Sequence, residues 1–145
     1  MPVQRMEHVG IVVDDLPAAV EFFTALGLEP RGEGTVEGDW AGRIIGLKDV
    51  RAEMAMLRTA DGHGEVELVK FLSPPYQGDE APAPSNAPGI RHLTFLVDDV
   101  DATVALLRAR GTELVGEVVD YKDVYRLCYV RGPAGIIVEL AQELS

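Results

Sequence analysis

Apolar residues follow the same pattern in two separate stretches of the chain. Residues 8–13 and residues 92–97 are each a short run rich in valine, isoleucine, leucine or phenylalanine, which is typical of a buried strand. Each run leads into two aspartates, then into apolar positions at helical spacing, and ends at a glycine. Aspartate is a favoured helix N-cap, and a glycine just past the last turn is a common stop signal. Each stretch therefore predicts a strand followed by a helix.

The two stretches are copies of one unit. HVGIVVDDLPAAVEFFTALGLEP begins at His8 and HLTFLVDDVDATVALLRARGTEL begins at His92, and they align without a gap at an offset of 84 (92 − 8). After each helix the composition predicts three more strands, at roughly 33–38, 52–59 and 65–72 in the first half and 113–119, 125–131 and 136–141 in the second. A repeat of this length predicts two tandem βαβββ modules.

Two segments without a counterpart set the predicted domain organisation. Residues 39–50, DWAGRIIGLKDV, add an apolar stretch that predicts a short helix over one end of the first sheet. Residues 73–89, SPPYQGDEAPAPSNAPG, are rich in proline, alanine and polar residues, which is typical of an extended linker. We therefore expect a first module at 1–72, a linker at 73–89 and a second module at 90–145.

Strand parity points to four polar residues with a common orientation: His8, Glu67, His92 and Glu139. Each alternates with apolar neighbours, and successive strand residues point to opposite faces of a sheet. If each helix covers the apolar face, these four side chains lie together on the other, concave face. One such residue alone is more typical of a solvated strand. The order His, Glu, His, Glu, with both histidines at equivalent repeat positions, predicts a site for one divalent ion of Zn, Ni, Co, Mn or Fe.

Composition narrows the classes of partner and the compartment. The formal charge of −11 argues against binding to nucleic acid or to an anionic membrane surface. No run reaches the length of a membrane span, and the N-terminus is too polar for a secretory signal. The single cysteine, Cys128, cannot form an internal disulfide. These features predict a cytoplasmic protein whose partner is a small molecule.

The sequence resembles the vicinal oxygen chelate superfamily, and is closest in pattern to methylmalonyl-CoA epimerase and glyoxalase I-like proteins. The resemblance rests on HVGIVVDDLPAAVEFFTALGLE, GEVELVKF, GIRHLTFLVDDVDATVALLRARG and RGPAGIIVELAQE. It implies an α+β, glyoxalase-like fold in which two βαβββ modules form curled mixed sheets around a concave site. It also implies that the metal ligands are His8, Glu67, His92 and Glu139.

The same resemblance implies a lyase or isomerase that acts on a small oxygenated substrate. In such enzymes a divalent metal stabilises an enolate or enediolate, and a carboxylate carries the proton. By that analogy Glu139 is the first candidate for the proton-carrying residue and Glu67 the second. The modules pair within one chain or between two chains, and we expect a homodimer.

Two other functions remain open at this point. One is a metal-free protein that binds a drug or natural product in the concave cavity, as bleomycin resistance proteins do. The other is an extradiol-type dioxygenase, which needs only two histidines and one carboxylate around iron. Among single residues, Arg126 and Arg131 are candidates for holding a substrate carboxylate, although a surface role is the plainer interpretation. Glu65 shares the face of Glu67 and either supports the metal ligands from behind or, as we expect, is a wet surface residue.

Overall fold

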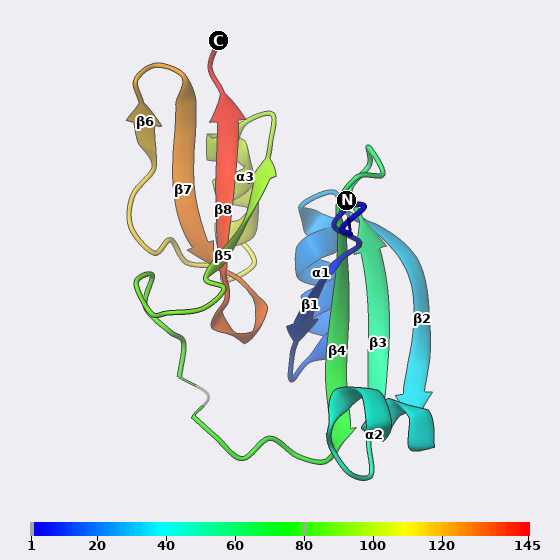
Figure 1. The fold of residues 1–145 in the computed structure, drawn as a ribbon. Helices are drawn as coiled ribbons and strands as arrows, with labels where there is room; N and C mark the ends of the chain where they lie inside the picture. The colour runs from blue at the N-terminus through cyan, green and yellow to red at the C-terminus, as the bar shows by residue number, and fades with distance from the viewer. Residues whose placement is uncertain (1, 80) are drawn as a thin grey trace. The chain divides into compact units, whose positions relative to one another are not determined.

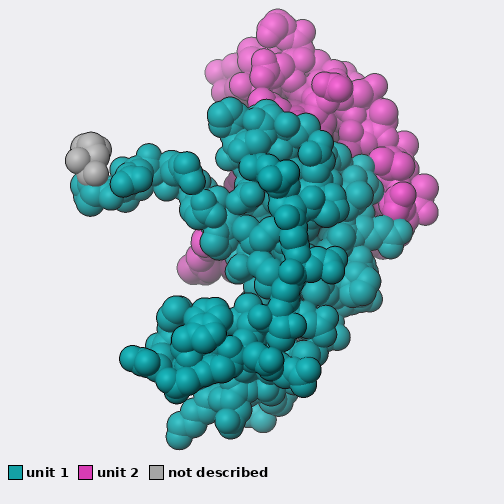
Figure 2. All heavy atoms as spheres, turned by 90° about the vertical axis from the view of Figure 1, so that its right-hand side faces the viewer, with its two compact units in different colours: residues 1–79 teal, residues 80–145 magenta. Residues whose placement is uncertain are grey.

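The chain forms two compact units, residues 1–79 and residues 80–145, shown in separate colours in Figure 2. The computed structural model describes residues 2–79 and 81–145. Each unit runs strand, helix and then three strands, so the predicted α+β fold of two βαβββ modules is confirmed. The finer boundaries at 1–72, 73–89 and 90–145 stay a prediction, and residues 1 and 80 lie outside the described residues.

The first unit is a four-stranded mixed sheet with a helix on one face (Figure 1). Its elements are β1 (Val9–Val12), α1 (Leu16–Ala25), β2 (Glu29–Glu37), α2 (Asp39–Ile45), β3 (Arg51–Arg58) and β4 (Glu65–Ser73). The strand order is β1-β4-β3-β2, with β1 parallel to β4 and the other pairs antiparallel. The helix predicted within 39–50 is confirmed as α2, which lies at one end of this sheet (Figure 1).

The second unit repeats this arrangement without the extra helix. Its elements are β5 (His92–Leu96), α3 (Val100–Arg108), β6 (Val119–Tyr121), β7 (Tyr125–Arg131), a single 3₁₀ turn (Pro133–Gly135) and β8 (Ile137–Glu143). The strand order is β5-β8-β7-β6, with β5 parallel to β8. Each first strand is therefore paired in parallel with the last strand of its own unit, which sets the positions of the candidate ligands.

The apolar core of each unit lies between the sheet and its helix. In the first unit α1 packs on β3 and β4, and Phe23, Leu57 and Leu68 are fully buried. In the second α3 packs on β7 and β8, and Leu107 and Leu140 are buried in the same way. Burial of these side chains is the main force that holds each helix to its sheet. Glutamates next to Leu68 and Leu140 are consequently turned away from the helix.

Aspartate caps begin α1 and α3, as the sequence predicts. Asp15 accepts a hydrogen bond from the backbone N–H of Ala18, and Asp99 accepts the same bond from Ala102, each at 3.0 Å. After α1 the chain reverses at Gly27, whose φ of 100° favours glycine. Both helices are short, and none in the described part of the chain is long and apolar enough to cross a membrane.

Replacing Asp99 with alanine is expected to lower the free energy of unfolding by about 0.5–2 kcal/mol, because the cap of α3 is lost. Asp98→Ala is the matched control, since its neighbour Asp99 accepts the capping bond. Urea denaturation of both variants measures the difference. Equal stability of the two variants would contradict the capping role.

One predicted strand is wrong in extent. The stretch 113–119 was expected as a continuous strand, but β6 spans only Val119–Tyr121. Upstream, Leu114 forms an isolated bridge to Val130, while Val119 pairs with Leu127. The register therefore shifts by two residues between these contacts, because Leu114 and Val119 are five apart and their partners three. Gly116 lies within this irregular segment and interrupts the strand.

Candidate metal centre

In the first unit, the β1–β4 pairing brings His8 to Glu67. His8 comes directly before β1, and the parallel register places Gly10 opposite Glu67. His8 Nε2 lies 3.9 Å from Glu67 Oε1, and the two side chains are 34% and 30% exposed. Both groups are thus held on the sheet and can still be reached by an ion or a small ligand.

In the second unit, β5 and β8 bring His92 to Glu139 in the same way. The parallel register places Thr94 opposite Glu139. His92 Nε2 lies 3.7 Å from Glu139 Oε1, and the side chains are 39% and 18% exposed. His8 and Glu67 are 59 residues apart in the sequence, and His92 and Glu139 are 47 apart. Strand pairing nevertheless forms the same pair of donors in both units.

Each pair suits two positions around a divalent ion. Bonds of about 2.0–2.2 Å to imidazole nitrogen and carboxylate oxygen place two donors on one ion roughly 3.0–3.5 Å apart. The observed separations of 3.9 Å and 3.7 Å exceed this by a few tenths of an ångström, which small side-chain rotations can close. No three metal-binding side chains cluster within the described ranges. A single centre made of all four residues stays a prediction.

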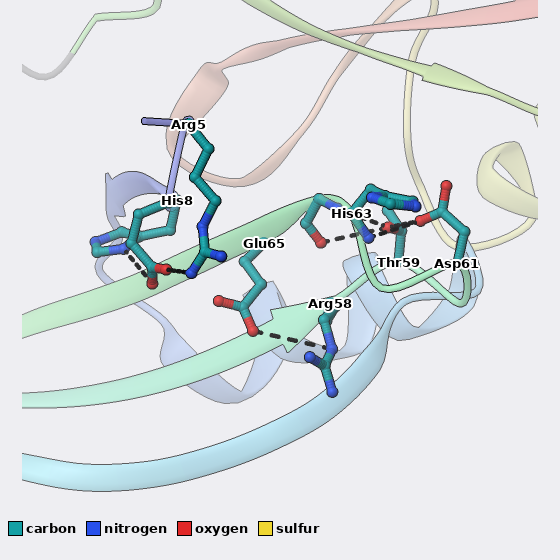
Figure 3. A network of polar contacts seen from close by, with 9 residues as sticks. Arg5, His8, Arg58, Thr59, Asp61, His63 and Glu65 are labelled. Carbon is teal, nitrogen blue, oxygen red and sulfur yellow. Dashed lines mark hydrogen bonds and ion pairs between the residues drawn. The ribbon is translucent and has the colours of Figure 1, made fainter. Parts of the chain in front are cut away.

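Glu7 orients the ring of His8. Glu7 Oε1 lies 3.4 Å from His8 Nδ1, and Arg5 lies at 3.4 Å from the same carboxylate (Figure 3). The hydrogen bonds with His8 and with Arg5 hold the pKa of the Glu7 carboxyl below its ordinary value. In the tautomer that donates from Nδ1 to Glu7, Nε2 carries the lone pair, and this atom lies 3.9 Å from Glu67 Oε1. A lone pair beside a carboxylate is an arrangement that a cation stabilises.

Thr94 is a site residue that strand parity did not single out. Its hydroxyl donates a 2.7 Å hydrogen bond to Glu139 Oε1. In addition, the ring of Tyr129 lies 5.1 Å from the ring of His92. Thr94 follows His92 by two residues, so strand parity places both on one face, but the pairing with Glu139 comes from the register of β5 and β8.

Glu65 is more enclosed than expected. Its side chain is 20% exposed, less than that of Glu67, and its carboxylate lies 4.0 Å from the Nε of Arg58 (Figure 3). The antiparallel register places Arg58 directly opposite Glu65. The expectation of a wet surface residue is therefore wrong: Glu65 forms a cross-strand ion pair on the face that carries Glu67.

Neither candidate arginine is free to bind a substrate carboxylate. Arg126 contacts Asp101 at 2.6 Å and Asp120 at 2.8 Å, and the hydrogen bonds that it donates to Asp120 and then to Asp101 raise the pKa of its guanidinium. These contacts tie α3 to β6 and β7. Arg131 donates hydrogen bonds to the backbone carbonyls of Ala83 and Gly135. Both arginines therefore connect segments of this unit through hydrogen bonds.

Cys128 is expected to be unreactive in the native protein. The residue is 3% exposed, and burial raises the pKa of its thiol. Because the thiolate is the reacting form, we expect Ellman's reagent at pH 8 to react with it at least about 100-fold more slowly than in denaturant. A native rate close to the denatured rate would contradict burial of this side chain.

The chain matches one protein family profile and a solved structure over most of its length. The family profile described as the glyoxalase/bleomycin resistance protein/dioxygenase superfamily matches residues 7–129, which include His8, Glu67 and His92 but stop before Glu139. A glyoxalase family protein from Bacillus cereus is 48% identical, with a TM-score of 0.95 over 99% of this chain and 96% of that one.

Two further proteins match most of this chain. A 2-epi-5-epi-valiolone epimerase from an Actinomyces species is 33% identical over 93% of this chain and 77% of its own length. The fosfomycin resistance protein FosX from Listeria monocytogenes, solved with Mn(II) and sulfate, is 16% identical with a TM-score of 0.61 over 97% of this chain and 93% of that one. The likeness to FosX concerns the fold alone.

Proposed function

Because the chain belongs to the glyoxalase/bleomycin resistance protein/dioxygenase superfamily, we propose that it is a divalent-metal-dependent lyase or isomerase acting on a small oxygenated substrate. The observation that carries the proposal is the pair of His–Glu contacts, at 3.9 Å and 3.7 Å, at equivalent positions of the two units. Two imidazoles and two carboxylates form a donor set that suits Zn, Ni, Co, Mn or Fe.

In this proposal, His8, Glu67, His92 and Glu139 hold the ion. The ion, when bound, supplies Lewis-acid polarisation of a substrate carbonyl. The substrate then loses a proton from the carbon next to that carbonyl, and a glutamate of the site accepts it. Return of the proton to the other face of the carbon gives epimerisation, and its return to a neighbouring atom gives isomerisation. Partial exposure of both glutamates leaves them accessible to such a substrate.

One relative supports this class of reaction. The Actinomyces relative is named as an epimerase. We propose a homodimer as well, since each unit alone provides two of the four ligands and the linker allows pairing within one chain or between two. The cytoplasmic location indicated by the single cysteine belongs to the same proposal.

The test measures proton exchange and metal content together. Purified protein is analysed for metal, then incubated in D₂O with a panel of small α-hydroxy ketones and 2-oxo acids, and mass spectrometry follows deuterium incorporation. We expect exchange that depends on a divalent ion and stops with EDTA. Absence of metal after incubation with Zn²⁺, Ni²⁺, Co²⁺, Mn²⁺ and anaerobic Fe²⁺ would contradict the proposal and favour the metal-free binding protein. Oxygen consumption with Fe²⁺ in place of exchange would favour the dioxygenase.

A further inference from the structure

The two His–Glu pairs differ in the residue that lies beside the glutamate. In the second unit the hydroxyl of Thr94 donates to Glu139 at 2.7 Å. In the first unit the equivalent residue is Gly10, which has no side chain to donate. Within residues 2–79 and 81–145, no side chain donates a hydrogen bond to Glu67. The carboxylate of Glu139 is therefore held by a side-chain hydrogen bond, and that of Glu67 is not.

The opposite neighbour of each glutamate differs as well. Tyr129 of β7 lies opposite Glu139, and its ring lies 5.1 Å from that of His92. The corresponding residue opposite Glu67 is Met56 of β3, a flexible thioether side chain in place of an aromatic ring. The second unit thus restrains both of its donors through neighbouring side chains. The lower exposure of Glu139, 18% against 30% for Glu67, agrees with this difference.

We propose that Thr94 is a positioning residue that holds Glu139 as the fixed carboxylate of the site, and that Glu67 is the carboxylate free to move toward a substrate. The hydroxyl bonds one lone pair of Glu139 Oε1 and leaves the remaining lone pairs for a cation. The inference rests on the proposed metal site. It favours Glu67 over Glu139 as the proton acceptor, because an unsupported carboxylate can reorient without breaking a hydrogen bond.

Thr94→Val tests the positioning role with the metal ion as the probe. Valine keeps the shape of threonine and removes the donor, so we expect the affinity for Zn²⁺, measured by competition with a chromophoric chelator, to fall about 10-fold or more. Thr94→Ser retains a hydroxyl and is expected to restore most of the affinity. Thr103→Val is the matched control, because Thr103 bonds only the backbone of Asp99 in α3. The melting temperature of each variant checks that the fold is retained.

The complementary experiment places the same hydroxyl beside Glu67. A Cβ at Gly10 would lie 4.0 Å from Glu67 Oε1, an ordinary contact distance, so Gly10→Thr can be accommodated. We expect Gly10→Thr to bind Zn²⁺ several-fold more tightly than Gly10→Val, which has the same shape without the donor. Equal affinities of these two variants would contradict the claim that Glu67 lacks support.

Comparison of the two glutamates gives the third readout. Glu139→Gln is expected to lose more Zn²⁺ affinity than Glu67→Gln, because it alters the fixed ligand. The reverse order would overturn the assignment. Failure of the inference can be told apart from failure of the proposed function. If the wild type binds Zn²⁺ and Thr94→Val binds it equally well, only the role of Thr94 is contradicted. Wild-type protein that binds no divalent ion removes both.

Discussion

Replacing His92 with alanine is expected to remove the bound divalent ion from the protein. The side chain supplies one of four proposed donors, and its Nε2 lies 3.7 Å from Glu139. Loss of a direct ligand is expected to exceed the roughly 10–100-fold loss of affinity that follows removal of a ligand's hydrogen-bond partner. Elemental analysis after gel filtration should find one ion per chain in the wild type and none in the variant.

A matched substitution separates this effect from a general effect of histidine loss. His63 lies in the turn before β4, where its backbone N–H donates a hydrogen bond to Asp61, and it is not one of the four proposed ligands. His63→Ala is therefore expected to keep one ion per chain. His8→Ala should behave like His92→Ala. Full metal content in both the His8 and His92 variants would rule out the proposed ligand set.

Replacing Leu68 with alanine is expected to lower the free energy of unfolding by about 2–5 kcal/mol. The residue is fully buried beneath α1, next to Glu67 in β4, and its truncation removes apolar contacts and leaves a cavity. Since domains of this size have a stability of about 5–15 kcal/mol, the loss is a large share of the total. Urea denaturation followed by circular dichroism measures it.

The control for this substitution is a leucine on the exposed side of α3. Leu106 is 44% exposed, so Leu106→Ala is expected to change the stability by less than about 0.5 kcal/mol. Leu140→Ala should resemble Leu68→Ala, because Leu140 is fully buried at the equivalent position beside Glu139. A loss below about 1 kcal/mol for Leu68 would contradict the core described above.

Much of the fold was predictable because the sequence contains two copies of one strand–helix pattern. The copies beginning at His8 and His92 share their strand pattern, their aspartate caps and their terminal glycines, and each feature has a local physical cause. Strand alternation predicted that Glu67 and Glu139 point away from the helices. In the structure, each lies beside the histidine of its own unit. Whether the four act as one metal centre stays a prediction.

The remaining features depend on register between distant strands, which local patterns do not contain. Thr94 and Glu139 are 45 residues apart, and only the β5–β8 pairing makes them neighbours. The same holds for Arg126, whose partner Asp101 comes from α3. The predicted strand 113–119 was wrong for the same reason, because composition indicates strand there but does not reveal the two-residue shift in its pairing with β7.

The additional helix α2 accounts for the unequal lengths of the two repeats. The span from His8 to Glu67 is 59 residues and that from His92 to Glu139 is 47, a difference of 12. The segment 39–50, which contains α2, is also 12 residues long. The two halves are thus consistent with descent from a duplicated ancestral module, one copy of which later gained or lost a segment. Length variation among homologues is accordingly expected between β2 and β3, where it leaves the paired histidine and glutamate in place.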